Sequence, residues 1–331
     1  MILATLDHKA IDVAQRLADR ELDSVVNPSQ LTERVLRRRS QVERGIKAPW
    51  SKLEGCFLFR AGELVLFGGY SGSYKSTAAS AVAVSALDQG YRVGYASLEM
   101  PAEDLIEQMA EIAAVRARPA EKWVERFAKW ADDRLFIYDR LDSIDPLEAL
   151  QLSICFRAFL GCDLIILDCL MMLGVAEDNE KEKKFVQQLA AIAKSYQCCI
   201  VLVHHMRKPM GDDGENRLPN RYSFIGSSHL VNVCASIVII WANRKKLWLR
   251  NAGHPVDDEE DGVDIKINIA KQRNAAWEGV AGLYIHDNAR VFCPTPDRKA
   301  RAVNIDHKPP LKSFVLEEPE DLSVVSLASE V

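Results

Sequence analysis

The chain has 331 residues, of which 48% are hydrophobic and 27% are charged, and its formal net charge at pH 7 is −5. The apolar fraction is enough to bury the core of one large domain or two ordinary ones, and the charged fraction is typical of a soluble cytoplasmic protein. The negative charge excludes nucleic-acid binding through bulk positive charge, so such binding would need local basic clusters or an assembled oligomer.

Two further classes of protein are disfavoured by features that the sequence lacks. The first residues have no charged segment followed by a long apolar core, so we expect no signal peptide, and no apolar stretch approaches the roughly 20 residues that cross a bilayer. The eight cysteines include no C-x-x-C pair, and several lie in apolar runs. This pattern favours buried thiols in a reducing compartment over disulfides or zinc. We therefore predict a cytoplasmic protein with no membrane partner.

Residues 1–45 are predicted to form a helical arm. Apolar side chains at near-helical spacing indicate a short amphipathic helix over 8–22, and a second helix is expected between a capping Ser29 and the breakers Gly45 and Pro49. The second helix carries few apolar side chains but a cluster of arginines, namely Arg34, Arg37, Arg38 and Arg39. Two interpretations are open, a solvated arm or an arm that packs on a neighbouring subunit.

After Gly62 the sequence alternates between strand and helix patterns. The predicted strands are 63–69, 92–99, 134–139, 163–168 and 198–205, and the predicted helices are 75–90, 101–115, 145–161 and 182–197. This alternation predicts an α/β fold with a mostly parallel sheet and helices on both faces.

The later part of the chain is predicted to extend this sheet with antiparallel strands. The segments concerned are 236–243, 245–251, 263–274 and 280–287. We assign residues 46–296 to this one domain. Residues 297–331 form a polar tail that ends in the acidic segment LEEPEDLSVVSLASEV, which we expect to be poorly ordered.

The segment FGGYSGSYKSTAAS, residues 67–80, is close to the phosphate-binding pattern G-x-x-x-x-G-K-[ST], but Tyr74 stands where the pattern has its second glycine. The segment leaves a predicted strand and enters a predicted helix at Lys75, which points backbone N–H groups at an anion. Lys75 would reach the β- and γ-phosphates, and the Ser76 hydroxyl would bind Mg²⁺. The candidate nucleotide-binding residues are Gly69, Ser71, Gly72, Ser73, Tyr74, Lys75, Ser76 and Thr77. Taken alone, the segment also fits a glycine-rich turn that carries Lys-Ser by chance.

Acidic residues at two strand ends favour the nucleotide site. Asp168 ends the apolar run 163–168, and Glu99 ends the predicted strand 92–99. The carboxyl ends of parallel strands share one edge of a sheet, beside the loop that follows the first strand. A P-loop ATPase needs one acid near Mg²⁺ and one carboxylate that activates water. The combination predicts a nucleotide-hydrolysing fold.

The chain contains, in order, the segments GELVLFGGYSGSYKST, YASLEMPAEDL, LIILDCLMML, IVLVHHMRKP and IAKQRN. In this order they resemble the RecA-like motor domain of DnaB-type hexameric replicative helicases, above all the helicase half of phage primase-helicases and mitochondrial Twinkle. The resemblance covers residues 45–294, and Ser-Leu-Glu-Met is its most specific element. It implies a RecA-like P-loop NTPase core that uses ATP or dTTP with Mg²⁺. The chain has no room for a primase domain, so we expect a helicase module alone, of phage or plasmid type.

The resemblance implies roles for the matching residues. Glu99 would be the general base for the attacking water, and Asp168 would support the Mg²⁺ ion held by Ser76. His205 would sense the γ-phosphate and transmit its state to a DNA-binding loop. His204 is the neighbour most easily confused with this sensor, and a histidine at a strand end is also compatible with a structural role.

The loop after His205 would line a central channel and grip single-stranded DNA in this family. The candidate DNA-binding residues are Arg207, Lys208, Arg217, Arg221, Gly226 and Ser227, of which Arg207 and Lys208 are the best placed for phosphate contacts. Without the resemblance, the segment would be interpreted as a solvated surface loop. The family has an arginine where this chain has Ile225, so that contact is in doubt.

Lys271 and Arg273 match a Lys-x-Arg element that reaches the neighbouring subunit's nucleotide in ring ATPases. Such an arginine can raise the rate of hydrolysis by about 10³–10⁵-fold. Basic residues at a strand end are also common on protein surfaces. If the family role holds, hydrolysis requires a homo-oligomeric ring, for which we expect six subunits.

The resulting prediction is an ATP-dependent replicative DNA helicase that moves 5′ to 3′ on single-stranded DNA, with primase and DNA polymerase as candidate partners. Two alternatives stay open. One is a RecA- or KaiC-like ATPase that binds DNA without unwinding it. The other is a helicase loader or regulatory paralogue that barely hydrolyses nucleotide, which Tyr74 keeps under consideration.

Overall fold

The computed structural model describes residues 27–33, 35–36, 45–174, 178–207, 214–226 and 228–314. The chain divides into two compact units, Met1–Arg44 and Gly45–Val331. Within the described residues, no helix is long and apolar enough to span a membrane.

The described part of the first unit is a short helical segment. A 3₁₀ turn at Pro28–Leu31 is followed by helical residues at 32–33 and 35–36. The backbone N–H of Asn27 donates to Gln30 Oε1 over 2.6 Å, so Asn27 is the N-cap and the prediction that Ser29 caps this helix is wrong. Pro28 follows the cap because its missing N–H costs nothing at the first helical position. The predicted helix over 8–22 and the arginine cluster at 34 and 37–39 lie outside the described residues.

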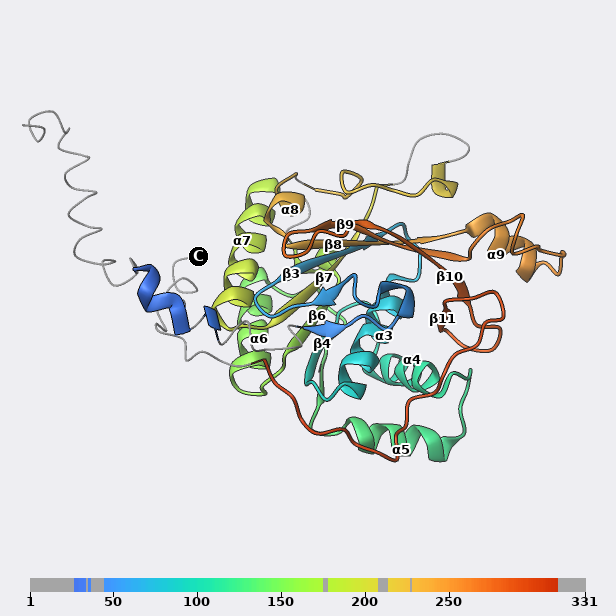
Figure 1. Ribbon diagram of the computed structural model, residues 1–331, viewed down its shortest axis with the longest axis horizontal. Helices are drawn as coiled ribbons and strands as arrows, with labels where there is room; N and C mark the ends of the chain where they lie inside the picture. Colours follow the sequence, from blue (N-terminus) through green and yellow to red (C-terminus); the bar gives the residue numbers. More distant parts are fainter. Residues whose placement is uncertain are drawn as a thin grey trace, which may run out of the picture. The chain divides into compact units, whose positions relative to one another are not determined.

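The second unit is built on a sheet with the strand order β11-β10-β9-β8-β3-β7-β6-β4-β5 (Figure 1). Strands β3 to β8 pair in parallel, and β9, β10 and β11 continue the sheet in antiparallel pairing. The predicted mostly parallel sheet with an antiparallel extension is therefore confirmed. The strand bounds are β3 Leu64–Gly69, β4 Val93–Ser97, β5 Leu135–Asp139, β6 Leu164–Asp168, β7 Cys199–His205, β8 Ser236–Ala242, β9 Ile265–Gln272, β10 Gly279–Ile285 and β11 Phe292–Cys293.

Helices cover both faces of this sheet. In Figure 1, α3, α4 and α5 lie on one side, and α6 and α7 lie on the other. The helix bounds are α3 Lys75–Asp88, α4 Ala102–Ala114, α5 Glu121–Ala131, α6 Pro146–Ala158, α7 Asn179–Ser195, α8 Ser228–Val233 and α9 Arg244–Asn251. The 3₁₀ turns Ser51–Leu53, Leu170–Leu173 and Gly214–Asn216, and a separate two-stranded sheet of β1 Ile46–Lys47 and β2 Leu58–Phe59, complete the described part of the unit.

Each face of the sheet has its own hydrophobic core. Along β3, Val65 and Phe67 belong to the core on the α3 side, whereas Leu64 and Leu66 belong to the core on the α7 side. Successive side chains of a strand point to opposite faces, so a strand that is covered on both faces must be apolar throughout. The polar residues that follow these strands consequently gather at the carboxyl edge of the sheet.

The prediction of a strand over 245–251 is wrong, because these residues form helix α9. The Asn243 side chain caps this helix by accepting a hydrogen bond from the Lys246 backbone N–H over 3.1 Å. The alternation Lys-Leu-Trp-Leu looks like a strand, yet the neighbours Lys246 and Leu247 are both buried while Trp248 is exposed. Two buried neighbours in sequence fit one face of a helix and not the alternating faces of a strand.

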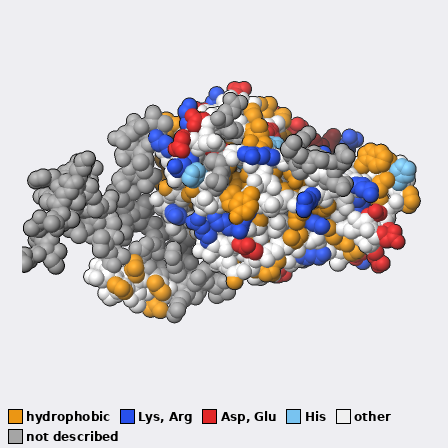
Figure 2. All heavy atoms as spheres, turned by 90° about the horizontal axis from the view of Figure 1, so that it is seen from above, with side chains coloured by type: hydrophobic (Ala, Val, Ile, Leu, Met, Phe, Trp, Pro, Cys, Tyr) orange, Lys and Arg blue, Asp and Glu red, His pale blue; other side chains and the backbone are white. Residues whose placement is uncertain are grey.

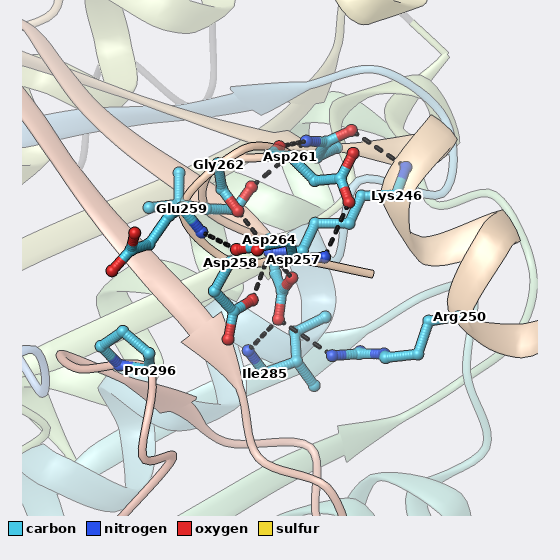
Figure 3. Close-up of polar contacts among 12 residues, drawn as sticks. Lys246, Arg250, Asp257, Asp258, Glu259, Asp261, Gly262, Asp264, Ile285 and Pro296 are labelled. Carbon is cyan, nitrogen blue, oxygen red and sulfur yellow. Dashed lines mark hydrogen bonds and ion pairs between the residues drawn. The ribbon is translucent and has the colours of Figure 1, made fainter. Parts of the chain in front are cut away.

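A buried ionic cluster attaches α9 to the antiparallel extension (Figure 3). Asp264 is fully buried and pairs with Lys246 Nζ over 3.1 Å and Arg250 Nη1 over 3.0 Å, both from α9. Its carboxylate also accepts a hydrogen bond from the Ile285 backbone N–H over 2.8 Å. Asp258 lies 2.5 Å from Lys246 Nζ, and Arg298 beside it lowers the pKa of this carboxyl to about 2. The cluster therefore fixes the position of α9, whose first residue lies near the turn after β3.

The described end of the chain is held by a second buried ion pair. Arg157 Nη1 lies 2.8 Å from Asp163 Oδ1, and both side chains are buried. Asp163 also accepts hydrogen bonds from the Phe314 backbone N–H and the Ser313 hydroxyl over 2.7 and 3.0 Å, and Arg157 donates to the Phe314 carbonyl. Residues up to 314 are thereby attached to the domain, and the acidic segment predicted to be poorly ordered lies outside the described residues.

We predict that Asp163→Ala lowers the free energy of unfolding by about 3–5 kcal/mol, because it leaves the buried Arg157 guanidinium without its counter-ion. Urea-induced unfolding followed by circular dichroism measures this loss. The matched control is Asp306→Ala, which removes the exposed partner of Arg126 and should cost less than about 1 kcal/mol. Equal losses in the two variants would contradict a dominant role for the buried pair.

Candidate active site

The turn between β3 and α3 has the backbone features of a phosphate-binding loop. β3 ends at Gly69, and α3 begins at Lys75. A Cβ atom at Gly69 would overlap the Ile240 carbonyl oxygen and Ser73 Oγ, and Gly72 has a φ of +70°. Glycine meets both demands, close approach of the backbone and a positive φ. The loop therefore curls back on itself and presents its backbone next to the start of a helix.

Tyr74 occupies the position of the second pattern glycine in the left-handed conformation that glycine would adopt. Its φ and ψ are 64° and 30°, a region that costs a residue with a side chain roughly 1–2 kcal/mol. The partly buried ring packs edge-on against Phe292, with the ring centroids 6.2 Å apart and an interplanar angle of 88°. The tyrosine thus keeps the loop conformation, and its ring lies against β11.

Lys75 is buried at the start of α3. Its Nζ donates to the Tyr70 carbonyl oxygen over 3.0 Å, which folds the side chain back over the loop. Burial lowers the pKa of this lysine, and the nearby carboxylates Asp168 and Glu99 oppose that shift. A cation held in this position is suited to interact with phosphate oxygens.

Asp168 ends β6 and is buried beside the loop. Tyr95 on β4 donates its hydroxyl to Asp168 Oδ2 over 3.0 Å, whereas Oδ1 is buried with no hydrogen-bond partner among the described residues. Burial raises the pKa of Asp168, and the nearby Ser76 and Tyr95 hydroxyls counteract that shift. A buried carboxylate oxygen without a partner, next to a serine hydroxyl, fits the hard oxygen ligands that Mg²⁺ prefers.

Glu99, Cys169 and His205 meet at the same edge of the sheet, just beyond β4, after β6 and at the end of β7. Glu99 Oε1 lies 3.5 Å from His205 Nε2 and accepts a hydrogen bond from the Cys169 thiol over 2.8 Å. The hydrogen bond with His205 is the largest of the effects that lower the pKa of Glu99 to about 2. The Glu99 side chain is 43% exposed. It is therefore an ionised carboxylate that solvent can reach, as a group that activates water must be.

The two adjacent histidines of β7 point in opposite directions. His205 faces Glu99, whereas His204 is fully buried, stacks on Phe224 and places Nε2 2.8 Å from the Ile225 carbonyl oxygen. Burial lowers the pKa of His204 to about 4. Because neighbouring strand residues alternate between faces, only one of the two histidines can lie beside Glu99, and that residue is His205.

Two of the predicted DNA-binding residues, Arg207 and Gly226, lie close to the end of β7. Met206 forms a β-bridge with Phe224, and the Arg207 backbone N–H donates to the Ser223 carbonyl over 2.8 Å. Arg207 Nη2 also donates to the Gly226 carbonyl over 3.4 Å. Lys208 and Ser227 lie outside the described residues. Both ends of the loop therefore lie next to His205, because residues 205–207 are paired with residues 223–225.

Basic and aromatic side chains lie together on the surface of this loop. Arg207 and Arg217 are exposed, and Arg221 lies over the ring of Tyr222, 5.5 Å from its centroid. Tyr222 is 72% exposed. Figure 2 looks down on the side that carries α8 and this loop in Figure 1, and it shows Lys and Arg side chains spread among hydrophobic ones. A basic surface with an exposed aromatic ring is suited to a single-stranded nucleic acid.

Lys271 and Arg273 lie at the end of β9, apart from the residues around Glu99. Lys271 Nζ donates to the carbonyl oxygens of Val231 over 2.5 Å and Cys234 over 2.8 Å, at the end of α8. The exposed Arg273 donates to the Asn232 carbonyl. Within their own chain these two basic residues therefore bind the carbonyl groups that end a short helix.

Three residues near the site were not identified by sequence reasoning. Arg244, the first residue of α9, donates to the Ser71 carbonyl of the loop, and a Cβ atom at Gly72 would overlap its guanidinium. Tyr95 and Cys169 lie within apolar runs and carry no sequence signal of their own. The parallel pairing of β8 with β3, which places the start of α9 beside the loop, is the signal for Arg244.

A cavity of about 720 Å³ lies next to the loop. Its lining includes Tyr74, Arg250, His286, Asn288, Arg290 and Phe292. They include aromatic rings and side chains that can donate hydrogen bonds. Such a lining is suited to a flat heterocycle with polar edges.

The chain was compared with known proteins. Residues 32–211, more than half of the chain, match the AAA domain family. A DNA helicase/primase of Enterobacteria phage T3 is 28% identical over 205 residues, which cover 56% of this chain and 36% of the phage protein. The chain thus spans little more than a third of the length of that relative.

Two solved structures share the fold. One is an isolated ATPase domain, which superposes with a TM-score of 0.64 at 15% identity, over 82% of this chain and 99% of that one. The other is a DnaB-like replicative helicase, solved in a study of its interactions with primase, which gives a TM-score of 0.62 at 17% identity, over 86% and 75% of the two chains. The fold is therefore the RecA-like ATPase fold of DnaB-type helicase motor domains.

We predict that Tyr74→Gly is more stable than Tyr74→Ala by about 1 kcal/mol. Both variants lose the contact with Phe292, but only glycine adopts a φ of 64° without a steric penalty. Chemical denaturation of the two variants measures the difference. Equal stability, or a more stable alanine variant, would show that residue 74 does not keep the left-handed conformation.

Proposed function

The chain belongs to the AAA domain family, and from this premise we propose that it is an ATP-dependent DNA helicase of the replicative DnaB type. In this proposal it translocates 5′ to 3′ on single-stranded DNA through the channel of a six-membered ring and unwinds the duplex ahead. Its substrates are ATP or dTTP and DNA. Primase and DNA polymerase are the partners that a replicative role implies.

One observation carries the proposal, namely the meeting of Glu99 and His205 beside a phosphate-binding loop. Glu99 Oε1 lies 3.5 Å from His205 Nε2, and both Lys75 and Asp168 interact electrostatically with the Glu99 carboxylate. The ionised Glu99 carboxylate can accept a proton from water. The adjacent His205 imidazole can form a hydrogen bond with a phosphate bound at the loop and lose it when that phosphate leaves. In this proposal Glu99 is the base for hydrolysis, and His205 is the group that responds to the γ-phosphate.

The loop residues hold the nucleotide in this proposal. Lys75 contacts the β- and γ-phosphates, and the loop backbone between Gly69 and Tyr74 surrounds them. Mg²⁺, held by the Ser76 hydroxyl and supported by Asp168, neutralises charge on the phosphate oxygens when it is bound. The neighbouring cavity is large enough for the base, with Tyr74 and Phe292 as its apolar wall.

The link between hydrolysis and DNA lies at the end of β7. His205 faces Glu99, while Arg207, two residues later, starts the proposed DNA-binding loop. The backbone of Ile225, near the end of that loop, donates to the His205 carbonyl over 3.3 Å. A shift of His205 would therefore move both ends of the loop, which makes β7 the physical connection between phosphate and DNA.

Arg273 and Lys271 act on the nucleotide of the neighbouring subunit in this proposal. The exposure of Arg273 supports the assignment, because a side chain that reaches across an interface must be accessible in the isolated subunit. Its contact with the Asn232 carbonyl then holds it in place when no neighbour is present. Hydrolysis consequently depends on ring formation.

We predict that Glu99→Gln slows ATP hydrolysis by about 10²–10⁴-fold while nucleotide binding persists, because the amide keeps the shape but cannot accept the proton of water. Phosphate release and the binding of a fluorescent nucleotide analogue measure the two effects. Glu103→Gln, an exposed carboxylate in the first turn of α4, is the control and should leave both unchanged. Unchanged hydrolysis in Glu99→Gln would remove Glu99 from its proposed role.

The decisive test is steady-state ATP hydrolysis with and without single-stranded DNA. We expect DNA to stimulate wild-type hydrolysis and Arg273→Ala to lower it by about 10³-fold or more. Mixtures of the two proteins should lose more activity than their proportions predict, because one defective subunit stops its neighbour. Arg301→Ala, an exposed arginine elsewhere, is the control. Weak turnover that ignores both DNA and Arg273 would instead indicate a nucleotide-binding regulator.

A further inference from the structure

Three side chains of different metal-binding chemistry converge at the carboxyl edge of the sheet. Glu99 Oε1, Cys169 Sγ and His205 Nε2 all lie within 4.8 Å of one another. They lie at or just after the carboxyl ends of three strands that are neighbours in the order β7-β6-β4. Among the described residues, these three form a group of histidine, cysteine and acidic side chains that is close enough together to hold a metal ion.

The ligand types select a class of metal. A thiolate, an imidazole and a carboxylate suit Zn²⁺ and similar borderline or soft divalent cations, whereas Mg²⁺ prefers oxygen ligands alone. Three protein ligands leave the fourth tetrahedral position for water. This cluster is therefore chemically distinct from the oxygen ligands of Ser76 and Asp168, although it lies next to them.

The present distances need only a small adjustment. Tetrahedral bonds of about 2.0–2.3 Å place neighbouring ligand atoms roughly 3.3–3.6 Å apart. The separation of Glu99 and His205 is already 3.5 Å, and that of Glu99 and Cys169 is a 2.8 Å hydrogen bond that must open. Glu99 is the most exposed of the three, so a rotation of its side chain can admit the ion.

We propose that Glu99, Cys169 and His205 bind one Zn²⁺ or a similar divalent cation, and that the bound ion stops nucleotide hydrolysis by occupying Glu99 and His205. The binding itself stands on the geometry of the three ligand atoms, whereas the inhibition rests on the proposed function. The Cys169 thiol, which donates to Glu99 in the free site, loses its proton to solvent when the ion binds. Chelation of the metal reverses the process, because no covalent bond other than metal coordination is formed.

The first test measures metal binding by the whole chain, with Zn²⁺ in competition with a chromophoric chelator and Co²⁺ as a spectroscopic probe. We expect one ion per chain and a thiolate-to-cobalt charge-transfer absorption. Cys169→Ser should weaken binding by about tenfold or more and abolish that absorption. Cys56→Ser, which removes a cysteine in a different part of the domain, is the matched control and should bind as wild type does.

Wild-type binding by Cys169→Ser would overturn the site. Thermal unfolding shows whether this variant is folded, and His205→Gln, which removes a second ligand and keeps Cys169, replaces it if it is not. His205→Gln should also weaken Zn²⁺ binding by about tenfold or more. Unchanged binding in that variant overturns the site equally.

The second test measures ATP hydrolysis as Zn²⁺ is added at constant Mg²⁺. We expect wild type and Cys56→Ser to be inhibited in parallel with Zn²⁺ occupancy and to recover on chelation, while the residual activity of Cys169→Ser resists the same concentration. Occupancy without inhibition would overturn the inhibitory part. Cys169-dependent binding in a protein that never hydrolyses ATP would refute the helicase but not the metal site. ATP hydrolysis in a protein whose Zn²⁺ binding does not depend on Cys169 would refute the metal site but not the helicase.

Discussion

The parallel strands β3, β4, β6 and β7 are buried on both faces, and each face is covered by its own hydrophobic core. Strands of this kind cannot carry a charge along their length, because a buried charge needs a partner or water. Polar groups can follow only where the strands end. The loop with Lys75, the acids Glu99 and Asp168, and His205 all lie at that one edge for this reason.

The site charges balance one another within this edge. Burial lowers the pKa of Lys75, and the negative charges of Asp168 and Glu99 counteract that shift. Burial raises the pKa of Asp168, and the hydroxyls of Tyr95 and Ser76 counteract it. Glu99, nearest to solvent, is the acid whose pKa is lowered. The two carboxylates differ in burial. Asp168 is buried and is suited to support a cation, whereas Glu99 is exposed and can accept a proton from water. Because Glu99 is the most exposed of the three proposed metal ligands, it gives a metal ion access to Cys169 and His205 from solvent.

The antiparallel extension contributes to the site through α9. The pairing of β8 with β3 places the start of α9 beside the loop, and the ionic cluster around Asp264 holds α9 there. Arg244 consequently contacts the loop carbonyl of Ser71. At the other end of the extension's strands, Lys271 and Arg273 bind the end of α8, which connects the proposed interface residues to the segment that returns from the DNA loop.

The α/β class, the strand–loop–helix around Lys75 and the position of Asp168 at the end of β6 could be predicted from the sequence, because they depend on local periodicity and on the pattern of apolar runs. Glu99 was predicted to end its strand and lies two residues beyond β4. It misassigned residues 245–251, where a capped helix imitates strand alternation, and it could not separate His204 from His205 by role without a resemblance. The contacts of His205 with Glu99, of Cys169 with Glu99 and of Arg244 with the loop became apparent from the folded chain alone. Those neighbours come from strands that are adjacent in the sheet but distant in sequence, and residue spacing carries no record of such pairing.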